Sequence, residues 1–275
     1  MTIATRNRFV RISTIISLIL AIGSIISIVM IVTHGKIHVR NPELRPLPFL
    51  EGFFLTPYSP LASLCAIGIF PFFALTGLIY ILFAFEKTQT VEITFFAACV
   101  FAISFEAARL LIPLYELGVY GSFFSVTISR FVFFSRIFTL LTLLASAIFA
   151  TGNTVQQMGP SIFLLAFFSF SLANSLPLDS GKISTAYLIS SGYQEMLNFF
   201  FLLVGFLSIV SYLILGKTRG ISEYSRAAGG VLLLFAGYTL LSACDSWLFF
   251  IAGSVLLFTG ASFYLKPMHQ YYLWQ

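Results

Sequence analysis

Charged residues are scarce in this chain. They make up 9% of its 275 residues, whereas about a quarter of a soluble domain is charged because its surface faces water. Fifteen basic and ten acidic side chains cannot cover a water-facing surface made from this sequence. Hydrophobic residues account for 59% and the mean hydropathy is +0.97, so most of the surface is expected to face lipid.

Residues that bind metals or form disulfides are also few. Cys65, Cys99 and Cys244 each lie in or beside an apolar run, without the paired spacing of a disulfide framework or zinc site, and are expected to be small buried side chains. His34 and His38 are four residues apart, but no carboxylate or cysteine completes a metal shell at matching spacing. The sequence therefore predicts no metal site and no cofactor.

Catalytic motifs are missing as well. The sequence has no His-Glu-x-x-His, no Gly-x-Ser-x-Gly and no aspartate pair within an apolar run, so we assign no catalytic residue and do not favour an enzyme. The net charge of +5 comes mostly from residues between apolar runs, and it lacks the clustered, aromatic-interleaved pattern of nucleic-acid binding. Nucleic acid is therefore not an expected partner.

What the sequence has in abundance is long apolar runs. A membrane-spanning helix needs about 20 apolar residues. Eight runs approach or exceed that length: 12–33, 61–84, 92–112, 127–149, 161–176, 193–215, 229–244 and 247–265. We predict an all-α, polytopic bundle of eight spans that forms one integral membrane domain over residues 1–275. Its first partner is the lipid bilayer. Helical spans are not those of an outer-membrane barrel, so we expect the cell membrane, as in a bacterial inner membrane.

The last two runs could form one span or two. Each is near the lower length limit, and a break of four residues, Ala243 to Ser246, separates them. Asp245 lies in this break and is better placed at an interface than in the middle of a bilayer. We therefore predict a tight helical hairpin.

Basic residues in the connections predict the orientation, because cytoplasmic loops are enriched in Lys and Arg. With both termini in the cytoplasm, eight basic residues lie inside: Arg6, Arg8, Arg11, Lys87, Lys217, Arg219, Arg226 and Lys266. Five lie outside: Lys36, Arg40, Arg45, Lys182 and, at a helix mouth, Arg130. This excess favours cytoplasmic termini.

The connection at 34–60 holds half of the ten prolines and is also apolar. Proline removes amide donors and favours extended backbone, so no helix is expected there. Such a loop is expected to lie along the outer interface or to cap the bundle. A lid over a substrate site is the alternative.

Charged side chains inside the apolar runs carry the most information, because charges in hydrocarbon must pair or line a wet cavity. Glu106 and Arg109 are three residues apart and share one helix face. Arg136 lies beside a hydroxyl stripe made of Ser135, Thr139, Thr142 and Ser146. This stripe fits either helix packing by small hydroxyls or a polar pathway.

The predicted topology places these charges at one depth. Six charged residues fall in the outer half of the membrane: Glu106, Arg109, Arg130, Arg136, Glu195 and Asp245. Together with Asn198 they are predicted to form a polar cluster open to the outer side. The alternative is a salt-bridge network that fixes the register of the helices.

Three classes of function fit these observations. The first is an outward-facing ligand-binding or sensing module that needs a protein partner for its output, because its inner loops are short. In size and layout the chain resembles the compact multi-span input modules of bacterial sensors, without a shared motif. The second is a small transporter or channel that uses the hydroxyl stripe. The third is a structural subunit of a membrane complex.

Overall fold

The computed structural model describes residues 3–35, 57–88, 90–115, 123–150 and 158–273. Eight helices in this part are long and apolar enough to cross a membrane. They are α1 (Ile3–Thr33), α2 (Pro60–Ala84), α3 with η2 and α4 (Val91–Leu114), α6 (Phe123–Phe149), α7 (Met158–Ser175), α8 (Gln194–Arg219), α9 (Ser222–Ser242) and α10 (Trp247–Leu273). The predicted all-α bundle with eight spans is confirmed.

Several helices extend beyond the apolar runs that predicted them. The first begins at Ile3 rather than at residue 12, α8 continues to Arg219, and α9 begins at Ser222 rather than at residue 229. Backbone hydrogen bonding continues through polar residues at the ends of spans, where long side chains can reach the interface. Gly220 then ends α8 in a left-handed conformation, with φ +67°.

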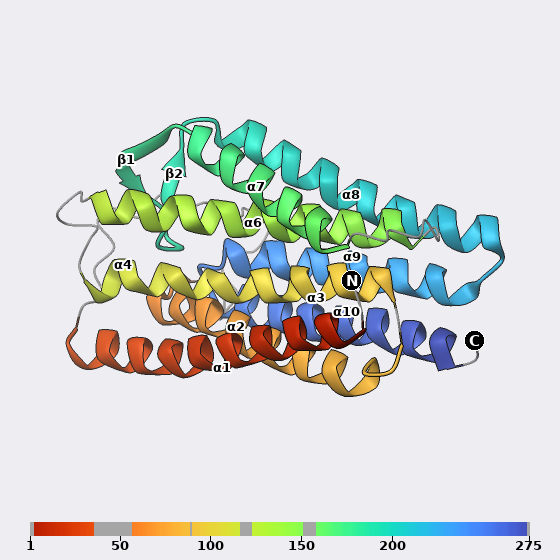
Figure 1. Ribbon diagram of the computed structural model, residues 1–275. Coiled ribbons are helices and arrows are strands. Elements are labelled where there is room, and N and C mark those ends of the chain that lie inside the picture. Colours follow the sequence, from red (N-terminus) through yellow and green to blue (C-terminus); the bar gives the residue numbers. More distant parts are fainter. Residues whose placement is uncertain (1–2, 36–56, 89, 116–122, 151–157, 274–275) are drawn as a thin grey trace.

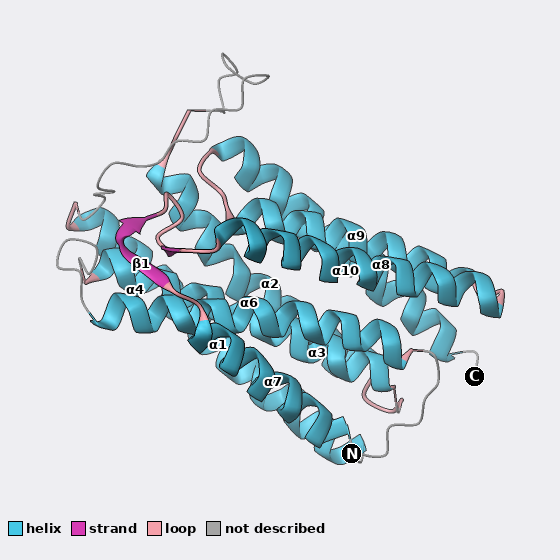
Figure 2. Cartoon of the chain, turned by 90° about the horizontal axis from the view of Figure 1, so that it is seen from above, coloured by secondary structure: helices cyan, strands magenta, loops and turns pink. Residues whose placement is uncertain are grey.

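The helices lie side by side along one direction, and both termini lie toward the same end of the bundle (Figure 1). We call this the termini end and the opposite end, where β1 and β2 lie, the far end. The span Val91–Leu114 is the most deeply buried, whereas α1 and α7 are the least buried. Figure 2 shows α1 and α7 along one side of the bundle, with α8, α9 and α10 on the other.

The two C-terminal helices form the predicted hairpin. The break at Asp245 separates α9 from α10, and the two helices pack along most of their length. Glycines allow this approach: a Cβ on Gly260 would lie 2.3 Å from the Leu234 backbone nitrogen, and one on Gly237 would lie 2.4 Å from that of Leu257. Small residues thus bring the two backbones into direct contact.

A small β-hairpin lies at the far end, between α7 and α8, where no strands were predicted. Strands β1 (Leu178–Ile183) and β2 (Ile189–Ser191) pair antiparallel, with an irregular register between them. Its turn reaches the helices: the Ser129 hydroxyl of α6 accepts from the Ile189 N–H at 3.3 Å, and Tyr187 is buried against α1 and α2. The hairpin therefore covers part of the far end.

Residues 36–56 of the proline-rich connection 34–60, which was predicted to be an outer loop or a lid, lie outside the described residues. The prediction of cytoplasmic termini also stays a prediction. The fold shows that α1 begins and α10 ends at the same end of the bundle, the termini end (Figure 1).

Candidate functional site

The site begins at an irregular part of the third span. Residues Ser104–Leu110 form a 3₁₀ helix, η2, between α3 and α4. Side chains three residues apart eclipse one another in this geometry. Glu106 and Arg109 are both fully buried, and Arg109 Nε lies 2.8 Å from Glu106 Oε2 as an ion pair. The 3₁₀ turn thus aligns the two charges within one helix.

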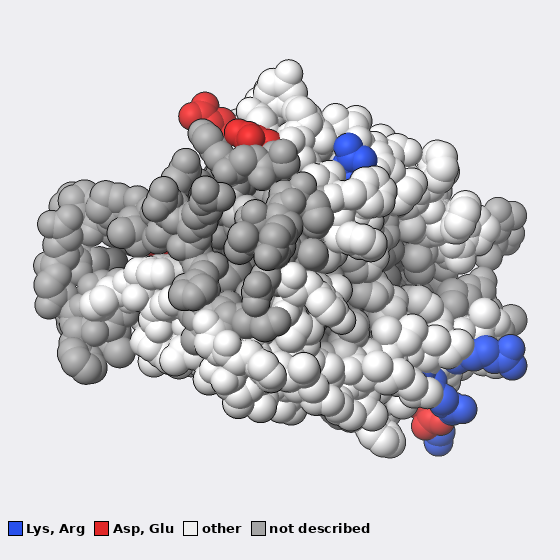
Figure 3. All heavy atoms as spheres, turned by 90° about the vertical axis from the view of Figure 1, so that its left-hand side faces the viewer, with Lys and Arg blue, Asp and Glu red and all other residues white. Residues whose placement is uncertain are grey.

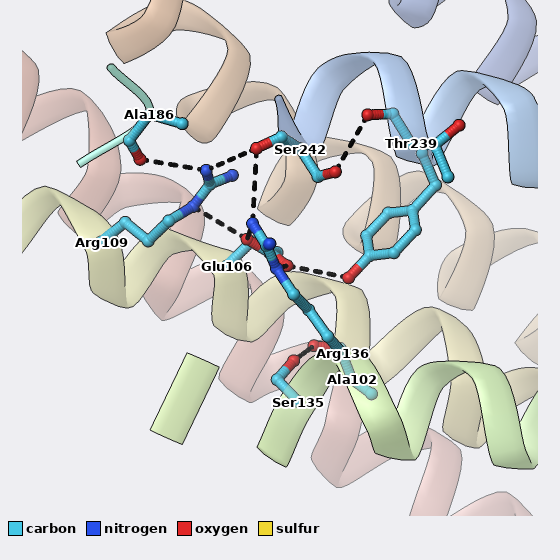
Figure 4. Close-up of polar contacts among 9 residues, drawn as sticks. Ala102, Glu106, Arg109, Ser135, Arg136, Ala186, Thr239 and Ser242 are labelled. Carbon is cyan, nitrogen blue, oxygen red and sulfur yellow. Dashed lines mark hydrogen bonds and ion pairs between the residues drawn. The ribbon is translucent and has the colours of Figure 1, made fainter. Parts of the chain in front are cut away.

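A second guanidinium reaches the same carboxylate from α6. Arg136 Nε donates to Glu106 Oε1 at 2.8 Å, and its Nη2 donates to Oε2 at 3.3 Å. The Tyr238 hydroxyl of α9 also donates to Oε1 at 2.8 Å. Beside Arg136, the Ser135 hydroxyl donates to the Ala102 carbonyl at 2.6 Å and joins α6 to α3 (Figure 4). One carboxylate therefore links three spans.

The two guanidinium groups also bind backbone carbonyls. Arg109 Nη1 donates to the Ser242 carbonyl at 3.0 Å and to the Ala186 carbonyl at 3.1 Å. Arg136 Nη2 is 3.4 Å from the same Ser242 carbonyl. Ser242 ends α9, and the C-terminus of a helix carries about half a negative charge. Figure 4 shows both guanidinium groups converging on this helix end.

Positive charge exceeds negative charge in this group, which we call the Glu106 cluster: Glu106, Arg109, Arg136 and Tyr238. Among the described residues, Glu106 is the carboxylate that forms ion pairs with the two guanidinium groups. Arg109 Nη2 is buried and has no hydrogen-bond partner among those residues. The Arg109 Cζ atom lies 5.8 Å from the centroid of the Phe70 ring. This ring can interact with the guanidinium through its π electrons, but it accepts no conventional hydrogen bond.

Three other residues predicted for the site lie apart from the cluster. Arg130 is exposed on α6, and Glu195 and Asn198 are exposed on the first turns of α8. The side chain of Asn198 accepts from Gln194 Nε2 at 3.1 Å, within its own helix. Figure 3 views the far end, and the charged side chains visible there lie at the periphery of the view. The boundaries of a span predict how deep a residue lies in the membrane, but they do not predict which way its side chain points. The sequence therefore could not show that these three residues lie apart from the cluster.

Asp245 lies at the turn between α9 and α10, half-buried, three residues beyond Ser242. Its carbonyl accepts from the Ser59 N–H at 2.9 Å, just before α2 begins. Burial first, and then the charge of Asp245, raise the pKa of the Tyr58 hydroxyl above its ordinary value. Asp245 therefore interacts with the start of α2, close along the chain to the helix end that binds Arg109.

The hydroxyl stripe of α6 is entirely buried and faces other helices. At its end nearest the termini, the Ser146 hydroxyl lies 2.5 Å from that of Tyr212 and 3.0 Å from that of Tyr264, which are themselves 2.8 Å apart. We call these three residues the hydroxyl ring. The sequence pattern identified Ser146 as part of the hydroxyl stripe, but Tyr264 was missed because nothing in its apolar run distinguishes it.

A second buried carboxylate was also missed. Glu92 stands at the first turn of α3, where it reads as a residue at the edge of a span, yet it is only 3% exposed. The Tyr272 hydroxyl of α10 donates to its Oε1. At the same end, the Arg6 guanidinium donates to the carbonyls of Phe85 and Thr88 and so caps the C-terminus of α2. Polar residues at the edge of an apolar run therefore became buried.

The cysteines lie where small apolar residues would. Cys99 and Cys244 are buried and Cys65 is half-buried, and all three are free thiols. Burial raises the pKa of the Cys244 thiol to about 12, which keeps it protonated at neutral pH. No group of three His, Cys, Asp or Glu residues within the described ranges could hold a metal ion.

The fold and these buried polar groups define the class: a multi-pass helical membrane protein with charged and hydroxyl groups inside the bundle. No protein-family model matches the chain. The chain is similar to an uncharacterized protein of Treponema pallidum (strain Nichols), with 28% identity over the full length of both proteins. That relative's description names no activity.

Proposed function

We propose that the chain is a membrane-embedded ligand-binding module that senses a small anion, such as a carboxylate, at the Glu106 cluster. The observation that carries this proposal is the unpartnered Nη2 of the fully buried Arg109, in a cluster with two guanidinium groups and one carboxylate. A buried charge without a full set of partners is costly, and an arginine fork fits a carboxylate with two hydrogen bonds.

The surroundings of Arg109 support a ligand rather than packing alone. The Ser242 carbonyl, at the end of α9, supplies about half of a negative charge, so the two guanidinium groups keep a residual positive charge that would attract an anion. The β-hairpin contributes the Ala186 carbonyl, so a segment outside the helices contacts the same arginine. Binding of an anion at Arg109 would then change contacts of η2, α9 and the β-hairpin at the same time.

We place the far end on the extracytoplasmic side, following the excess of basic residues at the termini end. The cluster lies where α9 ends, next to the turn that faces that side. The connections between helices at the termini end are short, and we propose that the signal passes to a partner protein in the membrane or cytoplasm. A protease-cleavable tag after Gln275 should stay intact when intact cells are treated with external protease.

The test is thermal unfolding of the purified protein with a panel of acetate, succinate, glutamate, chloride and phosphate. A specific anion at 100 times its Kd adds about 2.7 kcal/mol to the stability of the folded state. We expect a saturable increase in Tm with a carboxylate, which Arg109→Lys weakens because lysine keeps the charge but loses the fork.

The matched control is Arg130→Lys, the same change at an exposed arginine of α6. This variant should respond to the anion as the parent does. Equal Tm values with and without every anion of the panel would show that the cluster fixes helix register and binds no such ligand. A response that survives Arg109→Lys unchanged would place the anion elsewhere.

A further inference from the structure

Three side chains at the far end keep buried polar atoms without a hydrogen-bond partner among the described residues. These atoms are Nη2 of Arg109 and the hydroxyl oxygens of Tyr58 and Tyr187. Arg109 is fully buried, and Tyr187 is 2% exposed. In native proteins such buried groups are usually completed by water, an ion or a ligand. Two tyrosine hydroxyls therefore extend the set of unpartnered groups beyond the arginine of the Glu106 cluster.

Arg109 and Tyr187 lie on segments that contact each other. Arg109 Nη1 donates to the carbonyl of Ala186, the residue before Tyr187, at 3.1 Å (Figure 4). The side chain of Tyr187 also packs in one apolar cluster with Leu110, the residue after Arg109. The turn of the β-hairpin thus brings a buried hydroxyl beside the segment that carries the buried guanidinium.

Tyr58 joins the same group from the start of α2. It precedes Ser59, the N-cap of α2, whose N–H donates to the Asp245 carbonyl at 2.9 Å. Burial first, and then the Tyr58 hydroxyl, raise the pKa of Tyr187 above its ordinary value, so the two tyrosines interact electrostatically. Neither hydroxyl is a hydrogen-bond partner of the other. Both hydroxyls therefore remain able to bond a third group.

The backbone of Tyr187 adopts a strained conformation. Its φ is +53°, in the left-handed region, which is uncommon for a residue with a large side chain. Hydrogen bonds across the turn hold it there: the Ser184 N–H donates to the Leu188 carbonyl at 2.8 Å, and the Tyr187 N–H donates to the Ser184 carbonyl at 3.1 Å. Strained residues of this kind cluster at ligand sites, where the surrounding structure imposes their conformation.

We infer that the ligand of the Glu106 cluster is a short hydroxy acid. Its carboxylate binds Nη2 of Arg109, and its hydroxyl group binds the hydroxyls of Tyr58 and Tyr187. A hydroxyl group donates one hydrogen and accepts two, so it can bond both tyrosines. This inference rests on the proposed function, to which it adds a second point of recognition.

The surroundings disfavour other acids. A second carboxylate beside Tyr58 would be repelled by Asp245, whose charge, after burial, raises the pKa of the Tyr58 hydroxyl. An acid without a hydroxyl group would leave both tyrosine hydroxyls unpartnered, and a site with buried polar groups rejects ligands that cannot pair with them. A hydroxyl group meets both conditions, because it is neutral and forms hydrogen bonds.

The test compares hydroxy acids with the same acids lacking the hydroxyl, by isothermal titration calorimetry of the purified full-length protein in lipid nanodiscs. The pairs are lactate with propionate, and β-hydroxybutyrate and γ-hydroxybutyrate with butyrate. We expect one hydroxy acid to bind about fivefold more tightly than its partner, as one or two neutral hydrogen bonds allow. Tyr187→Phe should remove this preference and leave the Kd of the unsubstituted acid unchanged.

The matched control is Tyr193→Phe, at an exposed tyrosine two residues after β2, which should keep the preference. Removing an unpartnered hydroxyl breaks no hydrogen bond in the protein. The Tyr187→Phe protein without ligand should therefore unfold at the parent's Tm or above it. A lower Tm would show that the Tyr187 hydroxyl is bonded within the protein, which contradicts the inference. Tyr58→Phe provides a second variant if Tyr187→Phe does not fold.

The outcomes separate this inference from the proposed function. Equal Kd values for every hydroxy acid and its partner overturn the hydroxy-acid inference and leave anion binding at Arg109 intact. The same conclusion follows from a preference that survives in both Tyr58→Phe and Tyr187→Phe. If none of these acids binds, both the inference and the proposed function are wrong.

Discussion

The Glu106 cluster and the hydroxyl ring both provide partners for polar groups in the apolar interior of the bundle, but they do so with different structural elements. The Glu106 cluster holds three charges, and it uses a 3₁₀ turn, the end of α9 and a carbonyl of the β-hairpin to partner them. The hydroxyl ring is neutral, and its three side chains, from the α-helices α6, α8 and α10, satisfy one another. Charges in an apolar interior therefore required departures from regular helix geometry, whereas hydroxyls did not.

This comparison predicts that the cluster is the more fragile of the two regions. Removing one charge leaves another exposed to a low dielectric, whereas removing one hydroxyl costs a single neutral hydrogen bond. A graded series of substitutions can measure the difference. All of them are compared by thermal or denaturant unfolding of the purified protein and by the amount of folded protein in membranes.

The largest effect is expected from Glu106→Ala. It leaves Arg109 and Arg136 buried together without their carboxylate, which costs about 3–5 kcal/mol. We expect little folded protein in membranes and a strongly lowered Tm. Glu195→Gln, at an exposed carboxylate, is the control and should behave as the parent. A stable Glu106→Ala protein would mean that the two arginines reach water.

A smaller loss is expected from Arg136→Leu. Glu106 then keeps Arg109 and Tyr238, so its carboxylate is still partnered, and we expect a cost of about 2–3 kcal/mol. The decisive quantity is the difference between the two variants. If Arg136→Leu destabilised the protein more than Glu106→Ala, the result would contradict our conclusion that positive charge exceeds negative charge in the cluster.

Tyr238→Phe should cost about 1.5 kcal/mol, because it removes one hydrogen bond to an ionised carboxylate and keeps the ring. The ring itself packs edge-to-face against Phe70, with centroids 5.6 Å apart, and this contact survives the change. Combining Tyr238→Phe with Arg136→Leu should cost more than the sum of the two, since Glu106 then has Arg109 alone. Additive costs would show that the two groups act independently.

The smallest effect is expected from Tyr212→Phe and Tyr264→Phe, at about 1 kcal/mol each, because every bond in the hydroxyl ring joins neutral groups. This change in the free energy of unfolding can be measured from the shift in the denaturant midpoint, provided that the variants and the parent have the same m-value. A loss as large as that of Glu106→Ala would contradict the distinction between the two regions. Such a result would indicate an ionised member in the ring.

Much of the cluster could be predicted from the sequence, although its full composition could not. Glu106, Arg109 and Arg136 stand out because charges are rare within apolar runs, and helical spacing alone joins the first two. Arg130, Glu195 and Asn198 share a depth range with them in the sequence, yet they face outward. Depth follows from position along a span, but the direction of a side chain depends on which helices pack against that span.

Tyr264 and Glu92 show the opposite case. A tyrosine in an apolar run and a glutamate at its edge carry no signal of their own, and they became important when helices far apart in the sequence brought their partners close. The β-hairpin was missed for a similar reason, since strands of six and three residues depend on the helices that hold their ends together.

By itself, the sequence determined that this protein crosses a membrane as eight helices, because a chain with so few charges and such long apolar runs can satisfy its backbone in lipid only by helix formation. Tertiary structure alone decided which polar groups meet. Hydrogen bonds and ion pairs act over about 3 Å, and the rotation of each helix about its axis, which sets those distances, is fixed by packing between helices.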